Sequence, residues 1–218
     1  MKTNIQERIA ALREAMKEKN IDAYIIPSSD PHLSEYPADR WKSREWISGF
    51  DGSAGTVVIT ADKAGLWTDS RYFLQAGIQL EGTGIELYKM ALPETPTIPD
   101  FLLHELQNGQ TVGMDGQTYS VTDAAQLERT LNRKGIKLEA SYDLIDQVWK
   151  DRPAIPGNPL FEMPVELSGK SVREKLDEIN NQLRKQGADS LIIAALDEVA
   201  WTFNIRGTDV TYNPVVIS

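Results

Sequence analysis

Residues with distinct chemical uses lie close together in the first third of the chain. A glycine-rich run, Gly49-Phe-Asp-Gly-Ser-Ala-Gly55, suggests a phosphate loop or a nucleophilic serine. His32 and Glu35 are spaced like metal ligands on one turn. Arg71 follows a carboxylate in Trp67-Thr-Asp-Ser-Arg71 and could bind a carboxylate or a carbonyl oxygen. Each of these chemistries needs a particular structural context, which decides among them.

The glycine-rich run fits neither phosphate binding nor nucleophilic catalysis. A dinucleotide loop is Gly-x-Gly-x-x-Gly and opens a helix, whereas here the spacing differs and the apolar run 56–60 that follows is typical of a strand. A nucleophile elbow needs Gly-x-Ser-x-Gly, but Asp51 stands at the first glycine position before Ser53. A triad of Ser53 with His32 lacks the right context. We interpret the run as tight turns.

The remaining candidates reduce to one arginine. His32 and Glu35 are too few for a metal site, which needs three or four ligands, and His104 is expected on a helix surface. The chain has no cysteine, which excludes thiolate catalysis and cysteine metal sites. We expect neither a catalytic residue nor a metal ligand in this chain. Arg71 is the candidate for binding, and the simpler alternative is a structural ion pair with Asp69.

Charge and hydropathy limit the partners. The chain has 23 basic and 32 acidic residues among 218, a formal charge of −9, which argues against binding to nucleic acids or anionic membranes. No apolar run approaches the roughly 20 residues that span a bilayer. The first residues lead into an amphipathic helical pattern rather than a signal peptide. We expect a soluble, cytoplasmic protein.

Alternating strands and helices are expected to position these residues. Hydrophobic periodicity and turn signals predict helices over residues 5–16, 38–47, 71–80, 100–107, 122–134 and 142–150. They predict strands at 23–26, 56–60, 65–68, 85–90, 111–115 and 137–140. This alternation indicates an α/β fold, with a mixed sheet covered by helices.

The opening pattern returns after a proline-rich segment. We place a linker at 151–164, between a first domain over 1–150 and a second over 165–218. The second region repeats the first helix and strand at one constant offset, with a helix from Val172 to Leu183 and a strand at 189–195. The repeat predicts a duplicated fold whose second copy is incomplete, and hence the front part of a longer protein.

Taken together, these runs resemble the N-terminal region of Xaa-Pro aminopeptidases (aminopeptidase P) of the three-domain cytosolic type, built from creatinase/prolidase N-terminal domains. The resemblance is collinear over nearly the whole chain. The matching segments are Ala23-Tyr-Ile-Ile-Pro-Ser28, His32-x-Ser-Glu-Tyr36, Ser48-Gly-Phe-Asp-Gly-Ser-Ala-Gly-Thr56, Trp67-Thr-Asp-x-Arg-Tyr-Phe-Leu-Gln-Ala76, Trp149-x-Asp-Arg-Pro153, Leu196-Asp-Glu-Val-Ala-Trp201, Phe203-Asn-Ile-Arg-Gly207, Asp209 and Asn213-Pro214.

The resemblance implies a hydrolase that releases the first residue from peptides with proline second. In this family two divalent metal ions, usually manganese, activate a bridging water. Their ligands, two Asp, one His and two Glu, belong to a C-terminal pita-bread domain that this sequence does not include. The resemblance also implies that Arg71 reaches the substrate cleft, that His32, Glu35 and Tyr36 shape a neighbouring loop, and that the first domains help to build a homodimer.

Two hypotheses about function follow. The first is the non-catalytic front of a Xaa-Pro metallopeptidase, which alone would hold no cofactor and cleave nothing. The second is an aminopeptidase-like module without peptidase activity that binds histones or other peptides, as in the large subunit of FACT-type histone chaperones. A related creatinase or prolidase fits the three-domain layout and the Trp-Thr-Asp-x-Arg-Tyr run less well.

Overall fold

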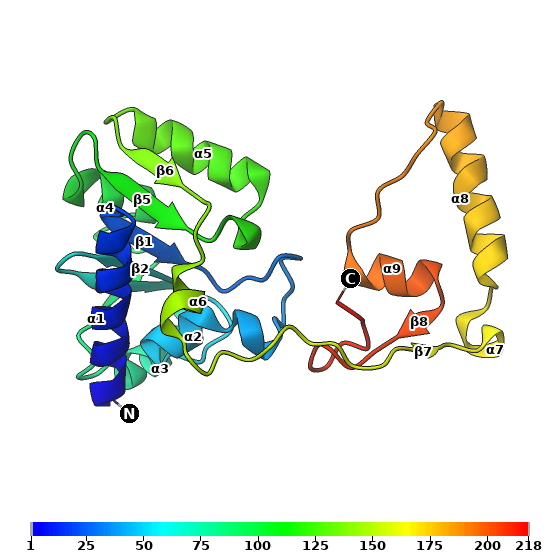
Figure 1. Ribbon diagram of the computed structural model, residues 1–218, viewed down its shortest axis with the longest axis horizontal. Coiled ribbons are helices and arrows are strands. Elements are labelled where there is room, and N and C mark those ends of the chain that lie inside the picture. Colours follow the sequence, from blue (N-terminus) through cyan, green and yellow to red (C-terminus); the bar gives the residue numbers. More distant parts are fainter. Residues whose placement is uncertain (1, 218) are drawn as a thin grey trace. The chain divides into compact units, whose positions relative to one another are not determined.

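The computed structural model describes residues 2–217, which form two compact units (Figure 1). The first unit contains the chain up to Glu35 together with Asp39–Pro153. The second contains Tyr36–Ala38 and the chain from Ala154 onward.

A six-stranded mixed sheet forms the centre of the first unit, in the order β4-β3-β2-β1-β5-β6. Strand β1 pairs with β2 in the antiparallel sense and with β5 in the parallel sense. The strands are β1 Ala23–Ile26, β2 Thr56–Thr60, β3 Ala64–Thr68, β4 Glu86–Lys89, β5 Thr111–Met114 and β6 Lys137–Glu139. The expected mixed sheet is therefore confirmed.

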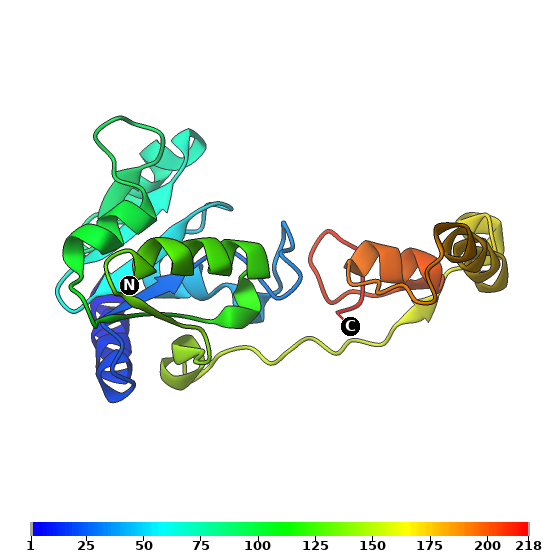
Figure 2. The same cartoon turned by 90° about the horizontal axis from the view of Figure 1, so that it is seen from above.

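Helices cover both faces of this sheet. Helices α1 and α6 lie on one face, and α4 and α5 on the other (Figure 2). The α-helices of this unit are α1 Lys2–Glu18, α2 Ser43–Ser48, α3 Phe73–Gln79, α4 Ile98–Glu105, α5 Val121–Asn132 and α6 Leu144–Val148. Three short 3-10 helices join them: η1 Asp39–Trp41, η2 Ser70–Tyr72 and η3 Gly116–Thr118. The predicted helix over 38–47 is thus two shorter pieces, η1 and α2.

Burial on both faces explains why the central strands are mostly apolar. All four residues of β1 are buried, and so are Val57, Val58 and Ile59 of β2. The helical stripe of α1, which includes Ile9 and Leu12, packs on one side of these strands. The opposite core includes Trp67, which stacks on Tyr88 with ring centroids 4.0 Å apart.

The second unit has few strands and a small core. Its elements are β7 Phe161–Glu162, α7 Val165–Ser168, α8 Val172–Gln186, α9 Leu196–Thr202 and β8 Ile205–Arg206. Strands β7 and β8 pair in the antiparallel sense, so a strand lies inside the linker predicted at 151–164. Helix α8 begins with a capping box of Ser171 and Glu174. The buried cluster of the described residues consists of Leu196, Ala200, Val210 and Val215.

The strand predicted at 189–195 is wrong. These residues have no regular secondary structure, and Leu191 and Ile192 are 55% and 91% exposed. The matching strand β1 is stabilised by a partner on each side, β2 and β5. A strand forms only when neighbours satisfy its backbone groups, and residues 189–195 have no paired strand in the described part of the second unit.

This difference predicts unequal hydrogen exchange in the two matching segments. We expect the amides of residues 189–195 to exchange at least about 100-fold faster than those of Ala23–Ile26, because only the latter donate within a buried sheet. Mass spectrometry of peptides from the deuterated 218-residue protein would measure this. Equal protection of the two segments would show that residues 189–195 are paired in solution.

Candidate functional site

Three loops meet at one edge of the first unit's sheet. Strand β1 ends where β2 begins, because Ile26 pairs with Val57, and β2 begins where β3 ends, because Thr56 pairs with Trp67. The loop after β1, the glycine-rich loop 49–55 and the turn after β3 are therefore neighbours. Thr68 joins two of them, since its Oγ1 donates to the Ala54 carbonyl at 2.6 Å. Arg71 lies in the turn that follows β3.

Arg71 and Asp69 form a two-pronged ion pair. Arg71 Nε and Nη2 donate to Asp69 Oδ1 and Oδ2 at 2.9 and 2.8 Å. Asp69 also caps η2, because its Oδ1 accepts the Arg71 backbone N–H at 3.1 Å. These bonds raise the pKa of the Arg71 guanidinium and lower the pKa of the Asp69 carboxyl. The Arg71 side chain stays 65% exposed, so it remains accessible to a ligand.

Tyr72 supports this pair from the side of the glycine-rich loop. The Arg71 guanidinium lies 5.1 Å from the centre of the Tyr72 ring. The Tyr72 hydroxyl and Ser53 Oγ are 2.7 Å apart, and Phe50 meets the Tyr72 ring edge-on at 5.8 Å. The hydrogen-bond partner of the Ser53 hydroxyl is therefore a tyrosine rather than a histidine. This agrees with the sequence analysis, which argued against Ser53 as a nucleophile.

The buried Arg44 organises the glycine-rich loop, and sequence analysis missed it. Its side chain donates to Ser28 Oγ at 2.8 Å and to the carbonyls of Phe50 and Gly52. Burial lowers the pKa of Arg44 to about 10. Since Arg44 lies in a run of charged residues typical of an exposed helix, we find no signal in the sequence that would have identified it.

Gly52 must be a glycine because the loop is tightly packed. A Cβ atom at this position would lie 2.3 Å from Phe50 Cζ and 2.7 Å from Tyr72 Cδ1. This close approach agrees with the interpretation of the run as tight turns rather than as a phosphate loop.

The other predicted site residues follow β1. The buried Asp30 accepts the backbone N–H groups of His32 and Ser34, both at 2.9 Å, and so shapes this loop. The charge of Glu35 contributes to the raised pKa of Arg71, after the larger effect of Asp69. Tyr36 belongs to the second unit, where its ring meets Tyr212 edge-on at 5.8 Å. Roles for His32, Glu35 and Tyr36 remain predictions.

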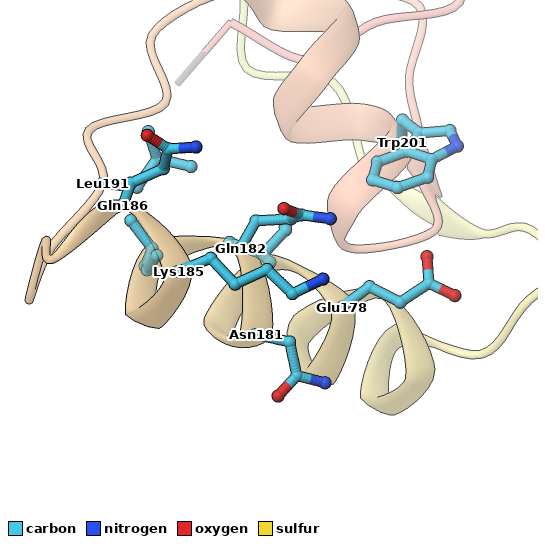
Figure 3. A pocket seen from close by; sticks show the side chains of 9 residues that line it. Glu178, Asn181, Gln182, Lys185, Gln186, Leu191 and Trp201 are labelled. Carbon is cyan, nitrogen blue, oxygen red and sulfur yellow. The ribbon is translucent and has the colours of Figure 1, made fainter.

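No group of three or more histidine or acidic residues within 2–217 is arranged to hold a metal ion. No helix in this range has both the length and the apolar character needed to cross a membrane. A groove in the second unit is lined by α8, Leu191 and Trp201 (Figure 3). It contains none of the site residues predicted from the sequence.

Comparison with known families decides what kind of domain this is. Residues 8–148 match the family described as creatinase/prolidase N-terminal domain. The chain belongs to this family. Residues 151–218 match a second family model with the same description. The creatinase/prolidase resemblance seen in the motifs is confirmed.

The curated relatives of this creatinase/prolidase-type chain are named as peptidases. A probable Xaa-Pro aminopeptidase P of Laccaria bicolor is 44% identical over 214 residues, 97% of this chain and 33% of the relative. That of Coprinopsis cinerea is 45% identical over 211 residues, 96% of this chain and 34% of the relative. The chain thus spans about a third of the length of these relatives.

A solved structure is similar to nearly the whole chain. The X-prolyl aminopeptidase of Caenorhabditis elegans, described as a cytosolic enzyme with a di-nuclear active site, is 34% identical and has a TM-score of 0.89. The match covers 98% of this chain and 36% of the worm enzyme.

Proposed function

We propose that this chain is the N-terminal, non-catalytic part of a metal-dependent Xaa-Pro aminopeptidase, which releases the first residue from peptides with proline second. The main support is the likeness to the worm enzyme, which extends over 98% of this chain but only 36% of that protein. The chemistry then belongs to the remaining part of the enzyme. There, two divalent metal ions, manganese by the family resemblance, would activate water.

The chain's own contribution is to bind substrate and to shape the cleft. Arg71 is the residue we assign to substrate, because it is exposed and oriented by Asp69 at the edge where three loops meet. His32, Glu35 and Tyr36 shape the neighbouring loop. We further propose a homodimer in the cytoplasm, following the family resemblance. The net charge of −9 argues against nucleic acid as a partner.

The domain layout is part of the same proposal. Residues 1–150 form the first creatinase-like domain, 151–164 link it to the next, and 165–218 begin the second. The first compact unit ends at Pro153, and the two family matches meet between residues 148 and 151. Both observations support a boundary close to residue 150.

A chimera tests the proposed function. Residues 1–218 would replace the matching N-terminal region of the Laccaria bicolor relative. We expect the chimera to release the first residue of Xaa-Pro peptides with Mn²⁺, because the exchanged regions are 44% identical over 97% of this chain. A rate within about tenfold of the natural enzyme corresponds to a barrier changed by at most about 1.4 kcal/mol. The matched peptide with alanine in place of proline is the control substrate. A folded, metal-loaded but inactive chimera would contradict the proposal and favour a binding module.

A further inference from the structure

We propose that Asp69 is a positioning residue that sets both the direction and the effective charge of Arg71, so that Arg71 donates to a neutral peptide carbonyl rather than to a carboxylate. This inference rests on the proposed function, in which Arg71 contacts substrate. Asp69 then does more than form a structural ion pair, because it decides which chemical group Arg71 recognises.

The geometry leaves three of the five guanidinium N–H groups for a ligand. Asp69 accepts the Nε–H and one Nη2–H, at 2.9 and 2.8 Å, so both N–H groups of Nη1 and the second one of Nη2 remain. Nη1 has no hydrogen-bond partner within residues 2–217 that would compete with a ligand. Because the guanidinium is planar and rigid, the bonds to Asp69 also fix the direction in which the remaining N–H groups donate.

Both partners of the pair are held in place by other contacts. Asp69 accepts the Arg71 backbone N–H at 3.1 Å, so its carboxylate cannot turn away without losing the cap of η2. On the arginine side, the Tyr72 ring lies 5.1 Å from the guanidinium, and the Tyr72 hydroxyl is bonded to Ser53. The direction of Arg71 is therefore set before a peptide arrives, which lowers the entropy cost of binding.

The charge of the pair decides which oxygen it prefers. A free arginine attracts a carboxylate through its positive charge, whereas Arg71 with Asp69 carries no net charge. An incoming carboxylate would also meet the negative charge of Asp69 at close range. A peptide carbonyl avoids this repulsion and still accepts the Nη1 hydrogen bond. The pair therefore suits a backbone carbonyl of a bound peptide.

Titration of the 218-residue protein tests whether the pair forms in solution. We expect the Asp69 carboxyl, followed by NMR, to titrate below the ordinary range of aspartate, because Arg71 stabilises its charged form. In Arg71→Ala the carboxyl should return toward that range. An Asp69 pKa that is the same in both proteins would overturn the inference, since the two side chains would not be paired.

Kinetics of the full-length enzyme test the role itself. Asp69→Asn keeps an oxygen for the cap of η2 but removes the charge. We expect on the order of tenfold lower kcat/KM for a C-terminally amidated Xaa-Pro-Xaa peptide. We also expect the ratio of kcat/KM for the free acid to that for the amide to rise about threefold or more, because Arg71 then presents its full charge. A loss of structure alone would not change this ratio.

Kinetics of Asp115→Asn and Arg71→Ala separate the role of Asp69 from other effects. Asp115→Asn is the matched control, since Asp115 caps η3 in the same way, by accepting the Gln117 N–H at 3.0 Å, but makes no bidentate bond to an arginine. It should leave the substrate ratio unchanged. If Arg71→Ala has no effect on kcat/KM, the proposed contact of Arg71 with substrate fails. If Arg71→Ala lowers kcat/KM but Asp69→Asn changes neither kcat/KM nor the ratio of free acid to amide, only the inference about Asp69 is overturned.

Discussion

Replacing Arg71 with alanine in the full-length enzyme is expected to lower kcat/KM for a Xaa-Pro peptide by about 5- to 150-fold. This corresponds to about 1–3 kcal/mol, the usual loss when a charged hydrogen bond to substrate is removed. The Arg71 side chain is 65% exposed and packs into no core, so the fold should be retained. Steady-state kinetics with manganese, together with the thermal midpoint of each protein, would measure the effect.

Arg173→Ala is the control for this substitution. Arg173 is also exposed, at 86%, and is also paired with a carboxylate, that of Asp177, but it lies on α8. We expect Arg173→Ala to leave kcat/KM within about twofold of the wild-type value, because surface ion pairs contribute little to the stability of the fold. Equal kinetics for wild type and Arg71→Ala would contradict a substrate-binding role for Arg71.

Replacing Arg44 with methionine should destabilise the first unit by about 3 kcal/mol. The substitution would remove the donor of two buried carbonyls, those of Phe50 and Gly52, and leave them without a hydrogen bond. Methionine keeps much of the apolar stem, so the loss reports the polar contacts rather than a cavity. Urea unfolding of the 218-residue protein, followed by tryptophan fluorescence, would give the free energy of unfolding.

The exposed Arg129 of α5 provides the matched control for Arg44. Arg129→Met should change the free energy of unfolding by less than about 0.5 kcal/mol, because no buried group depends on it. The loss in free energy of unfolding for Arg44→Lys should lie between those for Arg44→Met and Arg129→Met. One ammonium group cannot reach all three acceptors of Arg44 with the same geometry. A loss for Arg44→Met as small as that for Arg129→Met would show that the guanidinium does not hold the loop in solution.

The parts of the fold that were predicted from sequence are those with a local signal. Strand β1 was predicted because a strand buried on both faces is apolar throughout. The ion pair of Asp69 and Arg71 was foreseen as the simpler alternative for this arginine, because the two residues lie close in sequence. Residues 189–195 have the same apolar pattern but form no strand, since strand formation depends on partners distant in sequence. Arg44 was missed for a related reason, because its acceptors belong to a loop that only the folded chain brings around it.

The most direct test of this account is the activity of the 218-residue protein by itself. We would measure release of the first residue from a Xaa-Pro peptide with Mn²⁺ present, beside a full-length Xaa-Pro aminopeptidase as the positive control. If this chain binds substrate but leaves the metal chemistry to the remaining part of the enzyme, release should not exceed that of the peptide alone. Release that rises with protein concentration and stops on addition of EDTA would contradict the account, because it would place a catalytic metal centre within these residues.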